Sequence, residues 1–172
     1  MLAGFLKTLL GRRVENAVSS LSDNESYTAA CARAAADPEF FKNFRRDPDY
    51  TRILEHVSDA LGRAYFDLIR QDAALMGAMA EFKRNDEFGN PRCYEYPPAG
   101  MISPTTLRYI KVLSDLKKCF GSLDGMRICE IGVGYGGQCR IVNALFKPAA
   151  YCLVDLAPAL KLAQRYLEKF TV

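Results

Sequence analysis

Four glycines follow directly after a short apolar run in the C-terminal third of the chain, in the segment EIGVGYGGQ from Glu130 to Gln138. A second apolar run, AYCLVDL, lies shortly beyond it, and a helix-forming segment stands between the two. The order strand, glycine turn, helix, strand predicts a βαβ unit whose turn lets a ligand approach the backbone. This feature constrains the fold most, because it requires two parallel neighbouring strands joined by a crossover helix.

The boundaries of this unit are visible in the sequence. Its elements are, in order, a strand in MRICEIG, a helix over residues 138–146, a strand in AYCLVDL and a helix in APALKLAQRYLEKF. Pro148 ends the first helix because proline cannot continue it. Both strands are continuous apolar runs of the kind found in parallel sheets, so we expect them to be buried, together with Cys129 and Cys152.

The first two-thirds of the chain is predicted to be helical. The segment SDNE, from Ser22 to Glu25, has the form of a capping box, and Asp37 and Asp47 each precede a proline as a helix N-cap does. From Tyr50 onward, apolar residues keep a helical period. The period predicts a long helix that continues to about Phe82, with a bend at Gly62.

A segment of different composition follows. Residues 85–104 are rich in glycine, proline and asparagine and have no sustained period, which predicts a long loop. The next segment, SPTTLRYIKVLSDLKKCFG, predicts a helix that Ser103 caps and Gly121 ends. We therefore expect three regions: a helical N-terminal region (1–84), a loop and a helix (85–121), and a partial Rossmann-like domain (122–172).

Composition argues against several classes of protein. Of the 172 residues, 49% are hydrophobic and 25% are charged, and the net charge is only +3. The basic cluster KNFRR, from Lys42 to Arg46, is interpreted as a solvated helix face, so no nucleic-acid partner is expected. Six cysteines without a CxxC pair, and a single histidine, argue against a zinc site and favour a reduced, cytoplasmic protein. The apolar stripe from Leu2 to Leu10 is too short to span a bilayer, and membrane association is not expected.

The glycines alone do not identify the ligand. Gly132, Gly134 and Gly137 satisfy the dinucleotide pattern GxGxxG. The first two of them, taken with Gly136, satisfy GxGxG equally well. Glu130 discriminates between ligands, because a carboxylate beside the pyrophosphate of a dinucleotide is repulsive. A cofactor that carries a sulfonium and an ammonium group has the opposite preference, so the local charge favours S-adenosylmethionine over NAD.

Asp155 ends the second strand, 23 residues after Gly132, where a carboxylate can accept hydrogen bonds from both ribose hydroxyls. Each acidic residue also has a purely structural interpretation. Asp155 can cap the following helix, and Glu130 can be a solvated strand end. On a frame of strand, loop, helix and strand, the two together favour a nucleoside cofactor.

The segment EIGVGYGGQ together with LVDL resembles motif I and the following acidic position of class I S-adenosylmethionine-dependent methyltransferases. With the upstream GNP and SPTTLRYIKVLSDLKKCF, the chain from about Asp47 to its end resembles a sugar O-methyltransferase family, whose members are typically encoded among bacterial polysaccharide-assembly genes. The resemblance implies transfer of a methyl group from S-adenosylmethionine to a sugar or glycan acceptor. By the resemblance, the cofactor-binding residues are Glu130, Gly132, Gly134, Tyr135, Gly136, Asp155 and Leu156.

The resemblance also implies roles for parts of this site. Asp155 would hold the ribose hydroxyls and Leu156 would border the adenine, while Glu130 and the glycines would line the methionine and ribose. Arg108 and Tyr109, on the helix that would cover the cofactor, are interpreted either as contacts to the cofactor carboxylate or acceptor, or as a surface arginine and a packed tyrosine. The catalytic base is not identified. His56, the single histidine, is expected on a helix in a structural or exposed role.

Class I methyltransferases resemble one another in having a seven-stranded sheet, whereas this sequence supplies two of its strands. Two parallel strands with their helices cannot close a core on both faces. The expected fold is therefore α/β: a helical N-terminal region followed by the first βαβ unit of a Rossmann-like sheet, in a truncated chain. Coverage of the missing edge by the helical region, or by a partner, stays open. We expect the chain alone to bind the cofactor weakly or not at all and to be inactive.

Two alternatives to a methyltransferase stay open. One is a fragment of an NAD(P)-dependent oxidoreductase, which Glu130 and the long helical N-terminal region disfavour. The other is a non-catalytic helical interaction module that keeps a decayed nucleotide-binding fold. Homo-oligomerisation is also left open.

Overall fold

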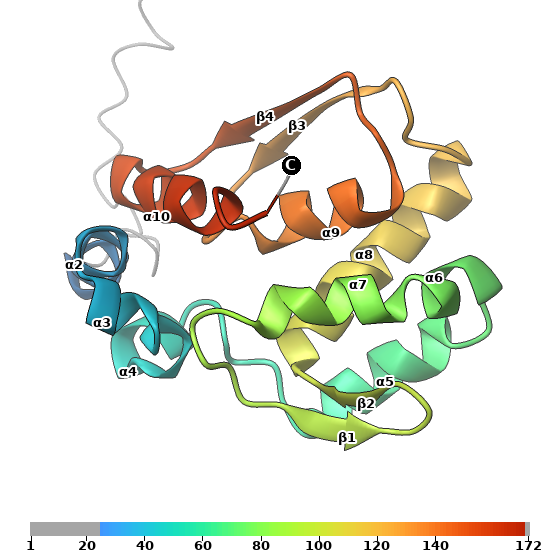
Figure 1. The fold of residues 1–172 in the computed structure, drawn as a ribbon, viewed down its shortest axis with the longest axis horizontal. Coiled ribbons are helices and arrows are strands. Elements are labelled where there is room, and N and C mark those ends of the chain that lie inside the picture. The colour runs from blue at the N-terminus through green and yellow to red at the C-terminus, as the bar shows by residue number, and fades with distance from the viewer. Residues whose placement is uncertain (1–24, 171–172) are drawn as a thin grey trace, which may run out of the picture.

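The computed structural model describes residues 25–170, which form a mixed α/β fold. Figure 1 shows a two-stranded sheet with helices beneath it, and a group of short helices and a hairpin on the far side of a long central helix. The sequence expectations for the Ser22 capping box and for the apolar stripe from Leu2 to Leu10 lie outside the described residues.

The chain begins with short helices. They are α2 (Glu25–Ala36), α3 (Pro38–Phe41), the 3-10 turn η2 (Phe44–Arg46) and α4 (Pro48–Thr51). Asp37 and Asp47 cap α3 and α4 as predicted, since one carboxylate oxygen of each accepts two backbone N–H groups of the first turn. In both helices the following proline occupies the first turn, where no N–H is needed.

The prediction of one long helix from Tyr50 to Phe82 is wrong. The chain instead forms, after α4, the elements α5 (Asp59–Ile69), α6 (Ala73–Gly77), α7 (Met79–Lys83) and the 3-10 turn η3 (Arg84–Asp86). Ser58 and Asp72 start new helices, because their side chains accept hydrogen bonds from the first-turn N–H groups of α5 and α6. Gly62 lies within α5, where a Cβ atom would come within 2.5 Å of the Tyr96 hydroxyl.

The predicted loop over residues 85–104 contains an antiparallel hairpin of β1 (Tyr94–Tyr96) and β2 (Gly100–Ile102), which the sequence did not predict. Its turn includes a cis peptide bond between Pro97 and Pro98. The helix α8 (Pro104–Phe120) follows as predicted. The Ser103 hydroxyl accepts the Thr106 N–H at 3.1 Å, and Gly121 ends the helix with a φ of 73°.

The βαβ unit is confirmed. It consists of β3 (Arg127–Ile131), α9 (Gly137–Leu145) and β4 (Ala150–Val154), followed by α10 (Ala157–Leu167). The strands β3 and β4 are parallel, with Glu130 opposite Leu153. The carboxyl ends of both strands therefore meet at one edge of the sheet, where the glycine turn begins.

The prediction that both strands are buried is wrong for one face of the sheet. Figure 1 shows α8, α9 and α10 on the same side of β3 and β4. Side chains on that side are partly covered, whereas Cys129, Cys152 and Val154 point to the opposite side and are exposed, and Ile131 is 82% exposed. Apolar runs report a preference for burial, but burial requires a covering layer, and no element within residues 25–170 covers this face.

The buried side chains form one cluster, to which all three regions of the sequence contribute. Its aromatic centre joins Phe44, Tyr135 and Tyr166, with ring centroids 5.8 Å apart for the first pair and 4.8 Å for the second. Arg165 of α10 donates to the carbonyl groups at the end of α2. The helical N-terminal part and the βαβ unit thus share a core, which fixes the glycine turn against the helices. Within residues 25–170, no helix has the length and apolar character needed to cross a membrane.

Candidate functional site

The glycine turn between β3 and α9 has a backbone that other residues adopt only with strain. Gly132, Gly134 and Gly136 have φ values of 78°, 55° and 85°, in the left-handed region that favours glycine. The Gly132 N–H donates to the Val154 carbonyl at 2.8 Å, which holds the turn against β4. The sequence therefore needs glycine here for the path of the backbone, whatever the turn binds.

The surroundings of these glycines differ. A Cβ atom on Gly134 would lie 2.5 Å from Leu54 Cδ1, and one on Gly136 would lie 3.1 Å from Leu167. Gly132 is exposed, and no atom lies within 4 Å of its Cβ position. Gly134 thus allows close packing against the segment that follows α4, and Gly136 against α10. Gly132 leaves the space in which a ligand can approach the turn.

Asp155 lies at the end of β4 and holds the turn in place. Its Oδ2 accepts the Gly134 N–H at 2.8 Å, and its Oδ1 accepts the Leu156 N–H at 2.7 Å. A carboxylate has about four lone-pair sites, so two backbone contacts leave capacity for two hydroxyl donors. Leu156, which is 37% exposed, starts α10 beside this carboxylate.

Glu130 lies on the helix-covered side of β3, and its Oε2 accepts a hydrogen bond from the Tyr151 hydroxyl at 2.9 Å. Burial raises the pKa of Glu130 to about 7, the Tyr151 hydrogen bond opposes the rise, and the charge of Asp155 adds to it. The two acidic residues singled out in the sequence therefore interact electrostatically. Near neutral pH the ionised form of Glu130 is therefore unfavourable in the folded protein, and a bound cation would stabilise it.

Tyr135 belongs to the buried core. Its side chain is fully buried, and its hydroxyl accepts a hydrogen bond from Asn85 Nδ2 at 3.0 Å. The Arg45 guanidinium lies 4.8 Å from its ring centroid. The structure thus leaves only the backbone of Tyr135 to face a ligand at the turn.

Tyr109 of α8 is a packed residue. Only 7% of it is exposed, its ring meets that of Tyr135 edge to face at 6.0 Å, and its carbonyl accepts the side-chain amide of Gln138. The Arg108 guanidinium lies 5.3 Å from the Tyr109 ring centroid. Of the two sequence-based interpretations of Tyr109, the structure favours the packed tyrosine.

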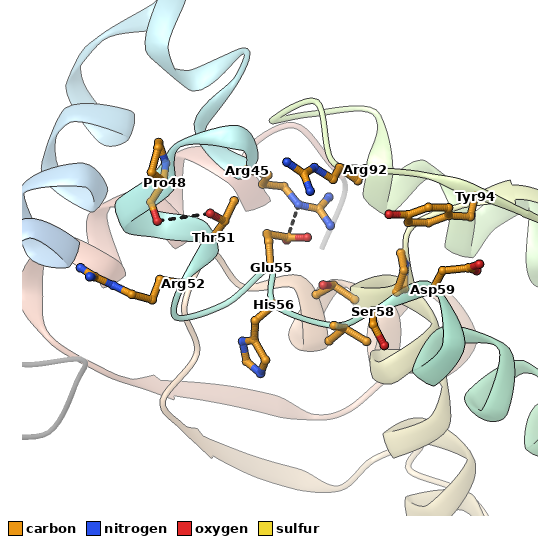
Figure 2. Close-up of a pocket in the computed structure, with 13 residues that line it drawn as sticks. Arg45, Pro48, Thr51, Arg52, Glu55, His56, Ser58, Asp59, Arg92 and Tyr94 are labelled. Carbon is orange, nitrogen blue, oxygen red and sulfur yellow. Dashed lines mark hydrogen bonds and ion pairs between the residues drawn. The ribbon is translucent and has the colours of Figure 1, made fainter.

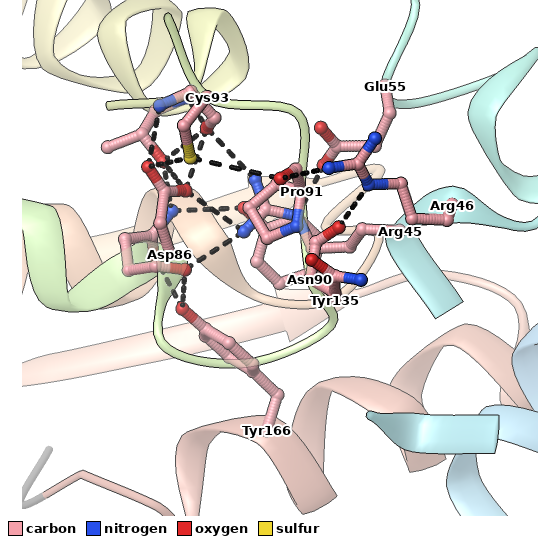
Figure 3. A network of polar contacts seen from close by, with 12 residues as sticks. Arg45, Arg46, Glu55, Asp86, Asn90, Pro91, Cys93, Tyr135 and Tyr166 are labelled. Carbon is pink, nitrogen blue, oxygen red and sulfur yellow. Dashed lines mark hydrogen bonds and ion pairs between the residues drawn. The ribbon is translucent and has the colours of Figure 1, made fainter. Parts of the chain in front are cut away.

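A buried polar network joins the turn to the helical region (Figure 3), and Arg45 is its central cation. The interpretation of KNFRR as a solvated face is wrong for this residue, which is 1% exposed. Its Nε donates to Glu55 at 2.6 Å, and its Nη1 donates to Asp86 at 3.1 Å. Burial alone would lower the pKa of Arg45, but Glu55 and other neighbours raise it well above its usual value. The guanidinium is therefore charged and paired.

Asp86 connects this cation to the start of α8. Its carboxylate accepts the Ser103 N–H and the Ser103 hydroxyl, both at 2.7 Å, and the Thr106 hydroxyl at 2.8 Å. Asn85 extends the network, since its side-chain amide donates to the Thr106 hydroxyl at 2.8 Å. Ser103 and Thr106 of the SPTT segment are thus buried, and their hydrogen bonds to Asp86 anchor the start of α8 beside the glycine turn.

No sequence pattern identifies Glu55, Asn85 and Asp86 as parts of this network. A buried charged residue has no periodic pattern and looks, in sequence, like a residue on a solvated face. The clustering of Ser103 and Thr106 at the start of α8 was visible, but a helix cap accounts for it. Only the partners, which lie far away in the sequence, show that these side chains are interior.

A cavity of about 480 Å³ opens beside the turn, between the segment that joins α4 to α5 and the start of α8 (Figure 2). Leu54 of that segment packs against Gly134, and the next two residues, Glu55 and His56, line the cavity. The expectation of His56 on a helix is wrong, because the residue follows the end of α4 and is exposed in the connecting segment. The cavity therefore lies next to the turn in space.

The described residues include no group of three or more histidine, cysteine, aspartate or glutamate side chains placed to hold a metal ion. The candidate site thus consists of the open backbone at Gly132, the carboxylates of Glu130 and Asp155, and the neighbouring cavity. No protein-family model, no curated protein and no solved structure matches this chain significantly.

Proposed function

We propose that this protein is an S-adenosylmethionine-dependent methyltransferase that acts on a hydroxyl group of a sugar, with its cofactor site at the turn between β3 and α9. The observation that carries the proposal is the pair of carboxylates, Glu130 and Asp155, at the carboxyl ends of the parallel strands β3 and β4, beside the glycine turn whose Gly134 N–H Asp155 accepts. S-adenosylmethionine brings a sulfonium, an ammonium group and a ribose to such a turn. All three are complementary to carboxylates.

Each residue of the turn has a role in this proposal. Glu130, whose pKa is raised to about 7, would be held in its ionised form by a cationic ligand. Asp155 keeps lone pairs for the ribose hydroxyls while it holds the Gly134 N–H. Gly132 leaves room for the cofactor at the backbone. When bound, the cofactor supplies a methyl group to the acceptor oxygen and leaves as a neutral thioether, while the hydroxyl proton passes to a base.

The alternative of a dinucleotide-dependent oxidoreductase is less well supported. Its pyrophosphate would have to lie at the start of α9, close to the same two carboxylates, and the repulsion would be strong in a partly buried site. The alternative of a non-catalytic module makes a different prediction, since it requires no nucleoside binding at all. Binding measurements separate the three alternatives.

The test is an NMR titration of the chain with S-adenosylhomocysteine, S-adenosylmethionine and NAD. We expect the first two to bind with a Kd of roughly 0.1–1 mM, which corresponds to weak binding, and to shift the signals of Gly132, Gly134 and Leu156. NAD is expected to bind at least tenfold more weakly. If neither S-adenosyl compound binds at millimolar concentration, the proposal is wrong, and preferential binding of NAD would support the oxidoreductase alternative.

Asp155→Asn is the matching variant, and Asp115→Asn, an exposed pair with Lys111 on α8, is its control. Loss of a charged acceptor is expected to weaken S-adenosylhomocysteine binding by roughly 10- to 100-fold. Because Asp155 also accepts two backbone N–H groups, the variant can disturb the turn itself. Glu130→Gln keeps the Tyr151 hydrogen bond, so its effect on binding reports charge with less disturbance. It should weaken binding of S-adenosylmethionine and leave that of NAD unchanged or improved.

A further inference from the structure

We propose that the 480 Å³ cavity beside the glycine turn binds a sugar that carries an anionic group, a carboxylate or a phosphate. The assignment of this sugar as the methyl acceptor rests on the proposed function, whereas its binding does not. The evidence is the set of side chains around the cavity, which combines two exposed arginines, an aromatic ring and residues that carry hydroxyl groups.

The innermost charges of the cavity are already neutralised. Arg45 and Glu55 form a buried ion pair with a distance of 2.6 Å, and side-chain exposures of 0% and 7%. The remaining Arg45 donors are directed at Asn85, Asp86 and Ser103. This pair therefore gives the cavity a rigid polar wall but leaves no free cation of its own for a ligand.

Two further arginines supply the available positive charge. Arg92 is exposed, and within residues 25–170 it has no hydrogen-bond or ion-pair partner. Arg52 has only long contacts of 3.4 Å with Asp49 and Ser26, and its side chain is 55% exposed. Exposed pairs of this kind are weak, so Arg52 is available to a ligand. Asp59 lines the cavity as well, but it is paired with Arg63, whose Nη2 lies 3.5 Å from the Asp59 Oδ1.

The positions of these side chains suit a small ligand with two different ends. Figure 2 shows Arg92 and Tyr94 on one side of Glu55, and Arg52 and His56 on the other. Tyr94 is 37% exposed and offers a ring face on which the C–H groups of a sugar can pack. Thr51, Ser58 and Thr105 also line the cavity. Planar guanidinium groups recognise carboxylate and phosphate oxygens with paired hydrogen bonds.

The size and location of the cavity support the same conclusion. Its volume lies within the range of small-molecule sites, at roughly 300–1,000 Å³. Glu55 and His56 line it and directly follow Leu54, which packs against Gly134, so an occupant lies on the side of this segment next to the proposed cofactor site. His56, an exposed imidazole without a hydrogen-bond partner in the described part of the chain, lines the same space.

The test is binding of four probes without cofactor: glucuronate, glucose 1-phosphate, glucose and inorganic phosphate, followed by NMR on the backbone signals of residues 51–59 and 92–94. We expect glucuronate or glucose 1-phosphate to bind and to change the chemical shifts of both segments. Comparison of the two affinities shows whether a carboxylate or a phosphate is preferred. Glucose is expected to bind at least tenfold more weakly. Binding of the charged sugar should weaken with added salt, because its partners are exposed.

Arg92→Ala is expected to reduce the affinity for the charged sugar about tenfold, and Arg92→Lys should restore part of it. Arg70→Ala, which removes an exposed arginine at the end of α5 away from the cavity, is the matched control and should have no effect. Equal binding of glucose and glucuronate, or an equal effect of the two alanine variants, would refute the role of charge. Inorganic phosphate that binds as tightly as glucose 1-phosphate would refute recognition of a sugar.

The same samples separate this proposal from the proposed function. If the charged sugar binds but S-adenosylhomocysteine does not, the cavity is a sugar site and the methyltransferase proposal fails. If S-adenosylhomocysteine binds and none of the sugars does, the cavity proposal fails alone. Glu130→Gln is expected to affect only the nucleoside, and Arg92→Ala only the sugar, because the two side chains lie in different parts of the site.

Discussion

Replacement of Glu130 by glutamine is predicted to make the protein more stable above neutral pH while it weakens the proposed cofactor site. In the folded protein, burial raises the pKa of Glu130 from 4.5 to about 7. A glutamine is neutral at all pH values, and its side-chain oxygen can still accept the hydrogen bond of the Tyr151 hydroxyl, which is 2.9 Å away in the native protein. The substitution therefore removes a charge that is unfavourable in the folded state and keeps the contact.

The sign and size of the effect follow from proton linkage. Between pH 4.5 and 7 the folded state binds more protons than the unfolded state, so the free energy of unfolding falls as the pH rises through this window. Each unit of pKa shift corresponds to about 1.4 kcal/mol, which gives an upper value of about 3 kcal/mol for Glu130. Partial solvent access lowers this value, and we expect a gain of roughly 1–3 kcal/mol for Glu130→Gln at pH 8 relative to its effect at pH 4.5.

The assay is urea denaturation of the wild-type protein and the variant at pH 4.5 and pH 8, followed by circular dichroism. The difference between the two pH values is the quantity to compare, because any packing change due to the amide is the same at both. Glu95→Gln, at an exposed carboxylate in β1, is the control and should change neither value by more than about 0.5 kcal/mol. A stability difference for Glu130→Gln that is equal at the two pH values would refute the reasoning.

Two further predictions concern the packing of the turn and the buried network. Gly137→Ala should destabilise the fold by about 1–3 kcal/mol in urea denaturation, because its Cβ would lie 2.7 Å or less from the side-chain atoms of Tyr109 and Tyr135. The control is Gly77→Ala, which should be neutral or stabilising because no atom lies within 4 Å of the Gly77 Cβ position. Equal changes in stability for the two variants would contradict the packing argument. Asp86→Asn should lower the free energy of unfolding by roughly 3 kcal/mol, because it leaves the buried Arg45 guanidinium with one carboxylate fewer. The control is Asp67→Asn, in an exposed ion pair with Arg70, which should lower the free energy of unfolding by less than about 1 kcal/mol. A similar loss in both variants would show that the buried network does not stabilise the fold more than an exposed ion pair does.

Local signals in the sequence were sufficient to predict helix ends wherever the residue at the end has one strongly preferred role. The DP dipeptides at Asp37 and Asp47 predicted two helix starts, and the Ser103 cap and Gly121 predicted both ends of α8. The helical period that begins at Tyr50 predicted helices but not their breaks, because a period records which face is apolar and is unaffected by a short interruption. The small hairpin was missed, since three-residue strands are too short for a period to be seen.

The candidate site was predictable in its acidic and glycine residues and not in its surroundings. The charge of Glu130 and the position of Asp155 could be read from the chain, because both follow directly from the order of strand, turn and helix. The raised pKa of Glu130 could not, since it depends on burial beneath helices. His56 and Arg92 lie in segments without a recognised motif, and only folding places them around the same cavity.

The sequence by itself determined that a parallel βαβ unit with a glycine turn is present, because glycine, proline and continuous apolar runs act within a few residues of each position. The tertiary structure alone decided which side chains the turn meets. It buried Arg45 with Glu55 and Asp86, turned Tyr135 into the core, and left one face of the sheet exposed. The physical reason is that burial and pairing depend on which distant segments come into contact, and such contacts are a property of the whole packed chain.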